Sequence, residues 1–160
     1  MDAHENRIDL PQWETLPDIG LYMDQVITLM ERTFRPFLPG AEITKSMVNN
    51  YVKVALIKRP DGKRYDREHL ALLIMIGVLK QALSLESIAQ VLAYLCEEGV
   101  QSGYARFVED VRAISERMDS GTLGDLPEAS QARAARASVT AAVYTIHARR
   151  LLISLREEKN

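Results

Sequence analysis

Amide, hydroxyl and ammonium side chains gather on one arc of a short segment, residues 44–57. At about 100° per residue, helical geometry places them on a single face of a helix. An asparagine amide can form two hydrogen bonds with adenine, and a lysine ammonium can approach guanine or a phosphate. The opposite arc is apolar and predicts a buried back, formed by Met47, Val48, Tyr51 and Ala55. The pattern therefore favours a helix that reads DNA bases through Ser46, Asn49, Asn50 and Lys53.

Basic residues flank this helix. Residues 44–64 hold six lysines and arginines against one acidic residue, Asp61, which gives a local net charge of +5 in a chain of net charge −2. The Asp61-Gly62 dipeptide favours a tight turn, so residues 58–65 are predicted to form a small β-hairpin. A hydroxyl at residue 44 can cap the helix, whose free first amides also favour phosphate. We expect the DNA backbone to contact Thr44, Lys45, Lys58, Arg59, Lys63 and Arg64.

The apolar periodicity of the remaining chain predicts the helices that position these residues. A helix of about four turns begins at Pro17 or Asp18 and ends near Phe37, before the Pro39-Gly40 turn. Later helices are predicted over residues 66–82, 84–97, 102–118 and 127–157. A winged helix-turn-helix has this order of elements: a helix, a basic hairpin and two further helices. Each polar residue alone would suit an ordinary solvated surface, and it is their combination on this layout that favours DNA contact.

Part of the chain is similar to a known family of DNA-binding domains. Residues 43–92 resemble the mercury-resistance-regulator (MerR) type, with Tyr51 and Leu56-Ile57 near the end of the recognition helix and residues 62–66 at the wing. This resemblance implies a winged helix-turn-helix that binds DNA as a dimer. The sequence departs from that type at Asn49, where a basic residue is usual, and it lacks a long helix with metal-binding cysteines.

The chain as a whole more closely resembles the domain of unknown function 1836 family. The residues that carry this resemblance are Trp13, Leu16-Pro17-Asp18 and the stretches 21–25 and 49–53. That family has no established activity, so the resemblance implies a fold and adds nothing about function.

The composition points away from several other classes of protein. Its 160 residues are 47% apolar and 26% charged, as in a packed soluble protein. The single cysteine, Cys96, excludes an intramolecular disulfide and a cysteine-rich metal site. His4, His69 and His147 lie far apart and no catalytic or nucleotide-binding motif is present, so we expect no enzyme activity and no cofactor. Because neither a signal peptide nor a membrane-spanning apolar run is visible, we expect a cytoplasmic protein with no membrane partner.

Two features of the C-terminal part leave alternatives open. The helix predicted over residues 127–157, roughly 45 Å long, either closes a bundle within the monomer or also packs against a second copy. Five residues either complete the helical core or line a small-molecule pocket, namely Tyr94, Cys96, Tyr104, Tyr144 and His147.

The sequence therefore predicts an all-α protein with a short β-hairpin wing, in which a MerR-like winged helix-turn-helix precedes a C-terminal helical extension. Residues 1–15 form a flexible N-terminus, residues 16–95 the DNA-binding domain, and residues 97–160 a helical region for dimerisation or sensing. We expect a homodimeric, sequence-specific transcriptional regulator that binds double-stranded DNA through its recognition helix and dimerises through its C-terminal helices. Any small-molecule or protein effector is unidentified. The alternative is a non-enzymatic protein-interaction module that uses the winged helix as a scaffold and binds no DNA.

Overall fold

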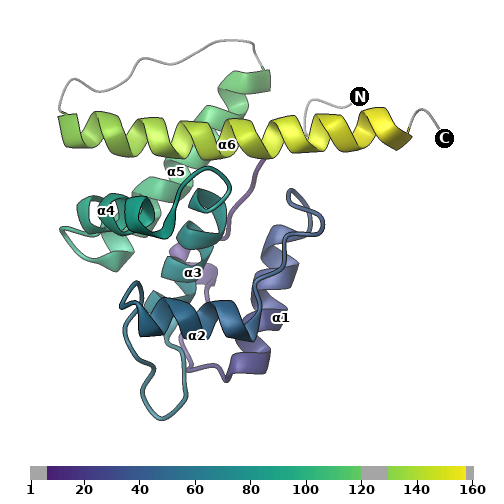
Figure 1. The fold of residues 1–160 in the computed structure, drawn as a ribbon. Coiled ribbons are helices and arrows are strands. Elements are labelled where there is room, and N and C mark those ends of the chain that lie inside the picture. The colour runs from purple at the N-terminus through teal and green to yellow at the C-terminus, as the bar shows by residue number, and fades with distance from the viewer. Residues whose placement is uncertain (1–6, 120–129, 158–160) are drawn as a thin grey trace.

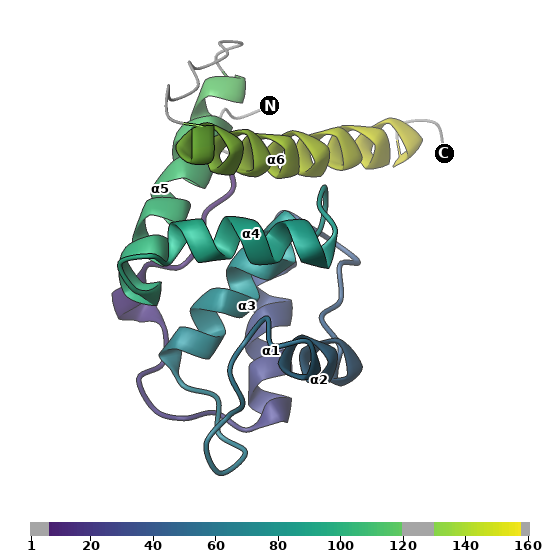
Figure 2. The ribbon, with the colours of Figure 1, turned by 60° about the vertical axis from the view of Figure 1, so that its left-hand side comes forward.

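The computed structural model describes residues 7–119 and 130–157. Within these ranges the chain is helical, and the predicted all-α class is confirmed. The elements are a short 3-10 helix, η1 (Trp13–Thr15), followed by α1 (Met23–Phe34), α2 (Lys45–Lys53), α3 (Arg67–Leu79), α4 (Leu85–Leu95), α5 (Val100–Asp119) and α6 (Ser130–Glu157). In both views α6 crosses one end of the molecule, and α2 lies towards the other end (Figures 1 and 2).

Helix α3 is the centre of the fold. It contacts α1, α5 and α6, and ten of its 13 residues are buried. The structure buries α3 on all sides, as is typical of an interior helix. At Gly77 the backbone of α3 lies against α1, because a Cβ atom there would stand 2.3 Å from Cζ of Phe34. This close approach fixes α1 against α3, and α1 in turn contacts α2.

Side-chain caps begin three of the helices where the sequence predicted. The amide of Met47 donates to Oγ1 of Thr44 at the start of α2, over 3.2 Å. The amide of His69 donates to Oδ1 of Asp66 at the start of α3, and the amide of Ser87 donates to Oγ of Ser84 at the start of α4. Each cap satisfies an amide that has no partner within its helix. The predicted starts of these three helices are therefore confirmed.

The N-terminal segment differs from its prediction over its described part, residues 7–15. Ile8 and Leu10 are buried in the core, and the amide of Ile8 donates to Oγ of Ser115 over 3.0 Å. The hydroxyl of Tyr104 donates to the carbonyl oxygen of Pro11 over 2.7 Å. Residues 7–15 of the predicted flexible N-terminus therefore pack against the core, and residues 1–6 lie outside the described residues. The reason is that two apolar residues at alternating positions suffice to pack an extended segment.

The predicted β-hairpin wing is reduced to a tight turn. Gly62 and Lys63 both have positive φ angles, 52° and 64°, and the amide of Arg64 donates to the carbonyl oxygen of Asp61 over 2.8 Å. These are the features of a type I′ turn. The described residues contain isolated bridges at Asp61–Arg64 and Leu21–Tyr65 but no strand. One physical reason is Pro60, which has no amide to donate to a ladder.

Helix α2 ends four residues earlier than predicted, at Lys53 instead of Ile57. Ala55 has a φ angle of 58°, and the amide of Leu56 donates to the carbonyl oxygen of Tyr51 over 2.9 Å. A left-handed residue with this hydrogen bond is a common helix terminus that normally uses glycine. Ala55 is exposed, so its predicted place on the buried face of the helix is wrong.

Glycine at position 55 is therefore expected to stabilise the protein. Ala55→Gly should raise the free energy of unfolding by about 0.5–1 kcal/mol, because glycine adopts a positive φ without a Cβ clash. Chemical denaturation measures this change. The matched control is Ala105→Gly at an exposed position inside α5, which should lower the same free energy by about 1 kcal/mol. A loss of stability in both variants would contradict the assigned left-handed conformation.

Candidate nucleic-acid interface

The four residues predicted to face DNA bases share one exposed surface of α2. Ser46, Asn49, Asn50 and Lys53 are exposed, and none of their side chains has a hydrogen bond or an ion pair within the described chain. The back of the same helix is anchored, since Val48 and Tyr51 are 0% and 3% exposed. Helix α2 thus presents two amides, a hydroxyl and an ammonium from a rigid support. We refer to Ser46, Asn49, Asn50 and Lys53 as the reading face.

The two predicted backbone-contact residues at the start of α2 are already engaged. The Thr44 hydroxyl accepts the cap hydrogen bond from Met47, and the Lys45 ammonium forms an ion pair with Asp24 of α1. Both residues remain exposed. The ion pair connects the start of α1 to the start of α2, so Lys45 contributes to their relative placement.

Lys58 is the most heavily paired cation of the interface. Its ammonium lies 3.0 Å from Oε2 of Glu68 and 3.1 Å from Oδ2 of Asp66. The hydrogen bonds to Glu68 and Asp66 raise the pKa of Lys58. Two nearby carboxylates neutralise its charge, so Lys58 offers less to a phosphate than the sequence suggested.

A buried histidine connects this cation to the start of α3. His69 is 1% exposed, and its Nδ1 accepts a hydrogen bond from the amide of Asp66 over 3.0 Å. Nδ1 also lies 2.7 Å from Oδ1 of Asp66, and Nε2 donates to the carbonyl oxygen of Lys58 over 3.1 Å. The network of Lys58, Asp66 and His69 therefore fixes the beginning of the loop that carries the tight turn.

This network predicts a loss of stability in acid. Burial raises the pKa of the Asp66 carboxyl, but the hydrogen bonds from the His69 amide and from Lys58 outweigh it, so the pKa lies below its ordinary value. A carboxyl whose pKa is lowered by folding stabilises the protein above its unfolded pKa, and this contribution disappears as the pH falls through the folded pKa.

The free energy of unfolding of the wild type should therefore exceed that of Asp66→Asn near neutral pH, and the difference should shrink below about pH 4. Asparagine is the matched replacement because it retains the cap and removes the charge. Urea denaturation of both proteins across this range provides the measurement. A difference that stays constant with pH would mean that the charge of Asp66 contributes nothing.

The remaining predicted backbone contacts lie on and beside the tight turn. Arg59, Lys63 and Arg64 are exposed, and none of them forms an ion pair with a carboxylate within the described residues. The Arg64 guanidinium rests on the ring of Tyr22, which the sequence analysis had placed inside the first predicted helix. Tyr22 instead precedes α1, so its proximity to Arg64 could not be read from the chain.

The five residues considered for a ligand pocket lie in different environments. Tyr104 is buried and packs against Trp13, with ring centroids 6.3 Å apart. Tyr144 is exposed, whereas Tyr94 lines a groove between α4 and α6. Cys96 is half-buried, and burial raises the pKa of its thiol, which keeps the group protonated and unreactive. His147 is buried on α6.

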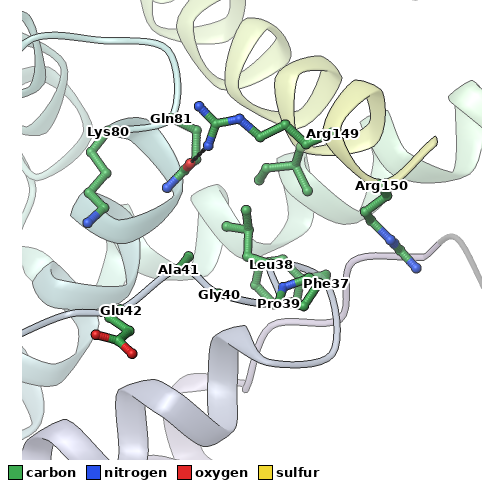
Figure 3. Close-up of a pocket in the computed structure, with 11 residues that line it drawn as sticks. Phe37, Leu38, Pro39, Gly40, Ala41, Glu42, Lys80, Gln81, Arg149 and Arg150 are labelled. Carbon is green, nitrogen blue, oxygen red and sulfur yellow. Dashed lines mark hydrogen bonds between the residues drawn. The ribbon is translucent and has the colours of Figure 1, made fainter. Parts of the chain in front are cut away.

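A second hollow lies between the loop after α1, the end of α3 and α6, with a volume of about 320 Å³. Three cations line it: Lys80, Arg149 and Arg150. Figure 3 shows that their charged groups point in different directions, and Arg149 donates a hydrogen bond to Oε1 of Gln81. The hollow therefore lacks convergent charges that would hold one anion. In the described parts of the chain, no three side chains of His, Cys, Asp or Glu gather in a way that could hold a metal ion.

Within residues 7–119 and 130–157, no helix combines the length and apolarity that crossing a membrane requires.

Comparison with known proteins identifies a family. No curated protein and no solved structure matches the chain. The family model described as domain of unknown function 1836 matches residues 11–109, a stretch that contains η1, α1 to α4 and the first half of α5. Because this match spans more than half of the 160 residues, the chain belongs to the domain of unknown function 1836 family.

Proposed function

We propose that this protein is a sequence-specific DNA-binding transcriptional regulator that acts as a homodimer. The observation that carries the proposal is the reading face, whose exposed amide, hydroxyl and ammonium groups have no partner within the described chain. A helix fits the major groove of B-form DNA, where each base pair presents a distinct pattern of donors and acceptors. Asparagine amides suit adenine, and a lysine suits guanine or a phosphate.

The surroundings of α2 support the same function. Helix α1 contacts α2, and the tight turn that carries Lys63 and Arg64 follows α2 in the chain. In a winged helix-turn-helix, a supporting helix and a basic wing take these places relative to the recognition helix. Arg59, Lys63 and Arg64 have no carboxylate partner within the described residues, so their charges remain available to phosphates.

The outer face of α6 supports the homodimer. Beside exposed Gln131, Arg133 and Arg149, five exposed residues follow a spacing of three and four, which is the repeat of helices that pair along a seam: Ala134, Ala137, Ala141, Tyr144 and Ala148. An exposed helix face is normally polar, whereas these five positions carry no charge. Small side chains let a second helix approach closely. The buried residues of α6, including Val139, Val143 and Ile146, face the monomer core instead.

A dimer would also make more base contacts than a single recognition helix can make. One helix of nine residues contacts only a few base pairs. Two copies related by a two-fold axis would read two half-sites, which adds both affinity and palindromic specificity. The proposal includes a cytoplasmic location and no enzymatic activity.

The test is selection of binding sites from a random pool of duplex DNA, repeated at two salt concentrations. Enrichment of a palindrome, with an affinity that falls steeply as salt rises, would support a dimer that neutralises several phosphates. Failure to enrich any sequence, together with no salt-dependent binding, would contradict the proposal. It would favour the alternative of a protein-interaction module, with the outer face of α6 as its contact surface.

A further inference from the structure

The exposed pair of Tyr22 and Arg64 lies at the base of the tight turn. The guanidinium carbon of Arg64 is 4.9 Å from the centre of the Tyr22 ring, and Nη2 of Arg64 donates to the Tyr22 hydroxyl over 3.1 Å. Tyr22 is 50% exposed even though tyrosine can bury a large apolar ring. The ring therefore covers little of the core, and its described contact is with the arginine.

The backbone on both sides holds this pair in place. Leu21 and Tyr65 exchange two hydrogen bonds of 2.9 Å, which fasten the segment before α1 to the residue after Arg64. At Gly20, a Cβ atom would stand 2.9 Å from Cβ of Arg64, so the arginine stem lies directly against that backbone. Glycine at position 20 thus makes room for the stem, and Tyr22 supports the charged end.

The charge of Arg64 remains uncompensated while its geometry is fixed. A guanidinium has five N–H donors, and the described contacts of Arg64 use one of them, on the Tyr22 hydroxyl. No carboxylate of the described residues pairs with Arg64, in contrast to Lys45 and Lys58. An arginine stacked on an aromatic ring has lost much of its rotamer freedom, and its planar fork matches two oxygens of a phosphate.

We propose that Tyr22 is a positioning residue that holds Arg64 for a two-hydrogen-bond contact with one phosphate of the DNA backbone. This inference rests on the proposed function, and it adds a residue from outside the predicted DNA-contacting set. Tyr22 acts through Arg64 and makes no base contact. Its loss should therefore weaken binding to all DNA sequences by the same factor and leave sequence preference unchanged.

The experiment compares the dissociation constants of variants for the duplex selected from the random pool, at two salt concentrations. Tyr22→Leu should weaken binding about tenfold, and Tyr22→Phe by less, because phenylalanine retains the ring and loses only the hydroxyl. Arg64→Lys should also weaken binding, since lysine keeps the charge but lacks the fork. Ile19→Ala is the matched control, because Ile19 is 67% exposed on the same segment, and this variant should bind like the wild type.

A double variant distinguishes two roles of Tyr22: positioning Arg64, or only holding the segment before α1 in place. If Tyr22 acts through Arg64, then Tyr22→Leu combined with Arg64→Ala should bind no more weakly than Arg64→Ala alone. Losses that add, or a Tyr22→Leu protein that binds as tightly as the wild type, would overturn the inference while the proposed function stands. Absence of DNA binding by the wild type would overturn both. Thermal denaturation of each variant identifies any protein that is unfolded at the assay temperature, and Tyr22→Phe retains the packing if Tyr22→Leu does not fold.

Discussion

Replacing Asn49 with alanine should relax the sequence preference of the protein at one position of each half-site. Asn49 is exposed on the reading face and its amide has no partner within the described chain, so the amide is available to a base. A pair of hydrogen bonds to the correct base contributes about 1–3 kcal/mol of discrimination. The measurement is the affinity of Asn49→Ala for the selected duplex and for duplexes with single base changes. The discrimination should fall by about fivefold to a hundredfold at the position that Asn49 reads.

A backbone-contact variant provides the matched comparison. Lys63→Gly should weaken binding to all these duplexes equally and lower the salt slope by about one. Glycine is the suitable replacement because Lys63 has a φ angle of 64°, which glycine adopts without strain. If Asn49→Ala lost affinity uniformly, or if neither variant changed binding, the assignment of the reading face would be wrong.

Local signals allowed the sequence to predict much of the fold and of the candidate site. Thr44, Asp66 and Ser84 cap their helices as expected, because a side chain three residues before an amide can satisfy it without help from the rest of the chain. The exposed face of α2 was predictable for the same reason, since helical periodicity alone separates Asn49 from Val48.

Features that depend on distant partners were not predictable. Nothing near Ile8 in the chain reveals that its amide meets Ser115, which is 107 residues away in sequence. Helix α2 ends early because Ala55, a non-glycine residue, adopts a left-handed conformation. The predicted hairpin is absent in part because Pro60 has no amide to donate to a ladder. The contact between Tyr22 and Arg64 spans 42 residues and needs the bridge at Leu21 to form.

The charges of the interface show the same division. Lys45 and Lys58 were predicted from the sequence to contact phosphates. The structure places both of them in ion pairs with acidic residues of other segments. A net charge summed over residues 44–64 could not include Asp24, Asp66 and Glu68, which lie outside that stretch. The positive potential of the surface therefore depends mainly on Lys53, Arg59, Lys63 and Arg64.

An arginine placed on the outer face of α6 should separate the proposed dimer. Ala141 is exposed at the middle of this outer face. In the dimer, Ala141→Arg would bring two like charges and two long side chains between α6 helices that must approach each other closely. Because arginine is a good helix former and position 141 faces solvent in the monomer, the fold should be unaffected. Light scattering at tens of micromolar protein should give the mass of a dimer for the wild type and of a monomer for the variant.

The same substitution should weaken DNA binding although it lies at the end of the molecule opposite α2 (Figure 1). Two linked half-sites gain from effective concentration, so losing the dimer should reduce affinity for a palindrome by about a hundredfold or more. Affinity for a single half-site should remain the same, because the reading face is untouched. The control is Ala105→Arg at an exposed position of α5, which should retain both the dimer and the affinity. A wild type that is monomeric at these concentrations would contradict the dimer. A dimeric Ala141→Arg protein would place the interface away from this face of α6.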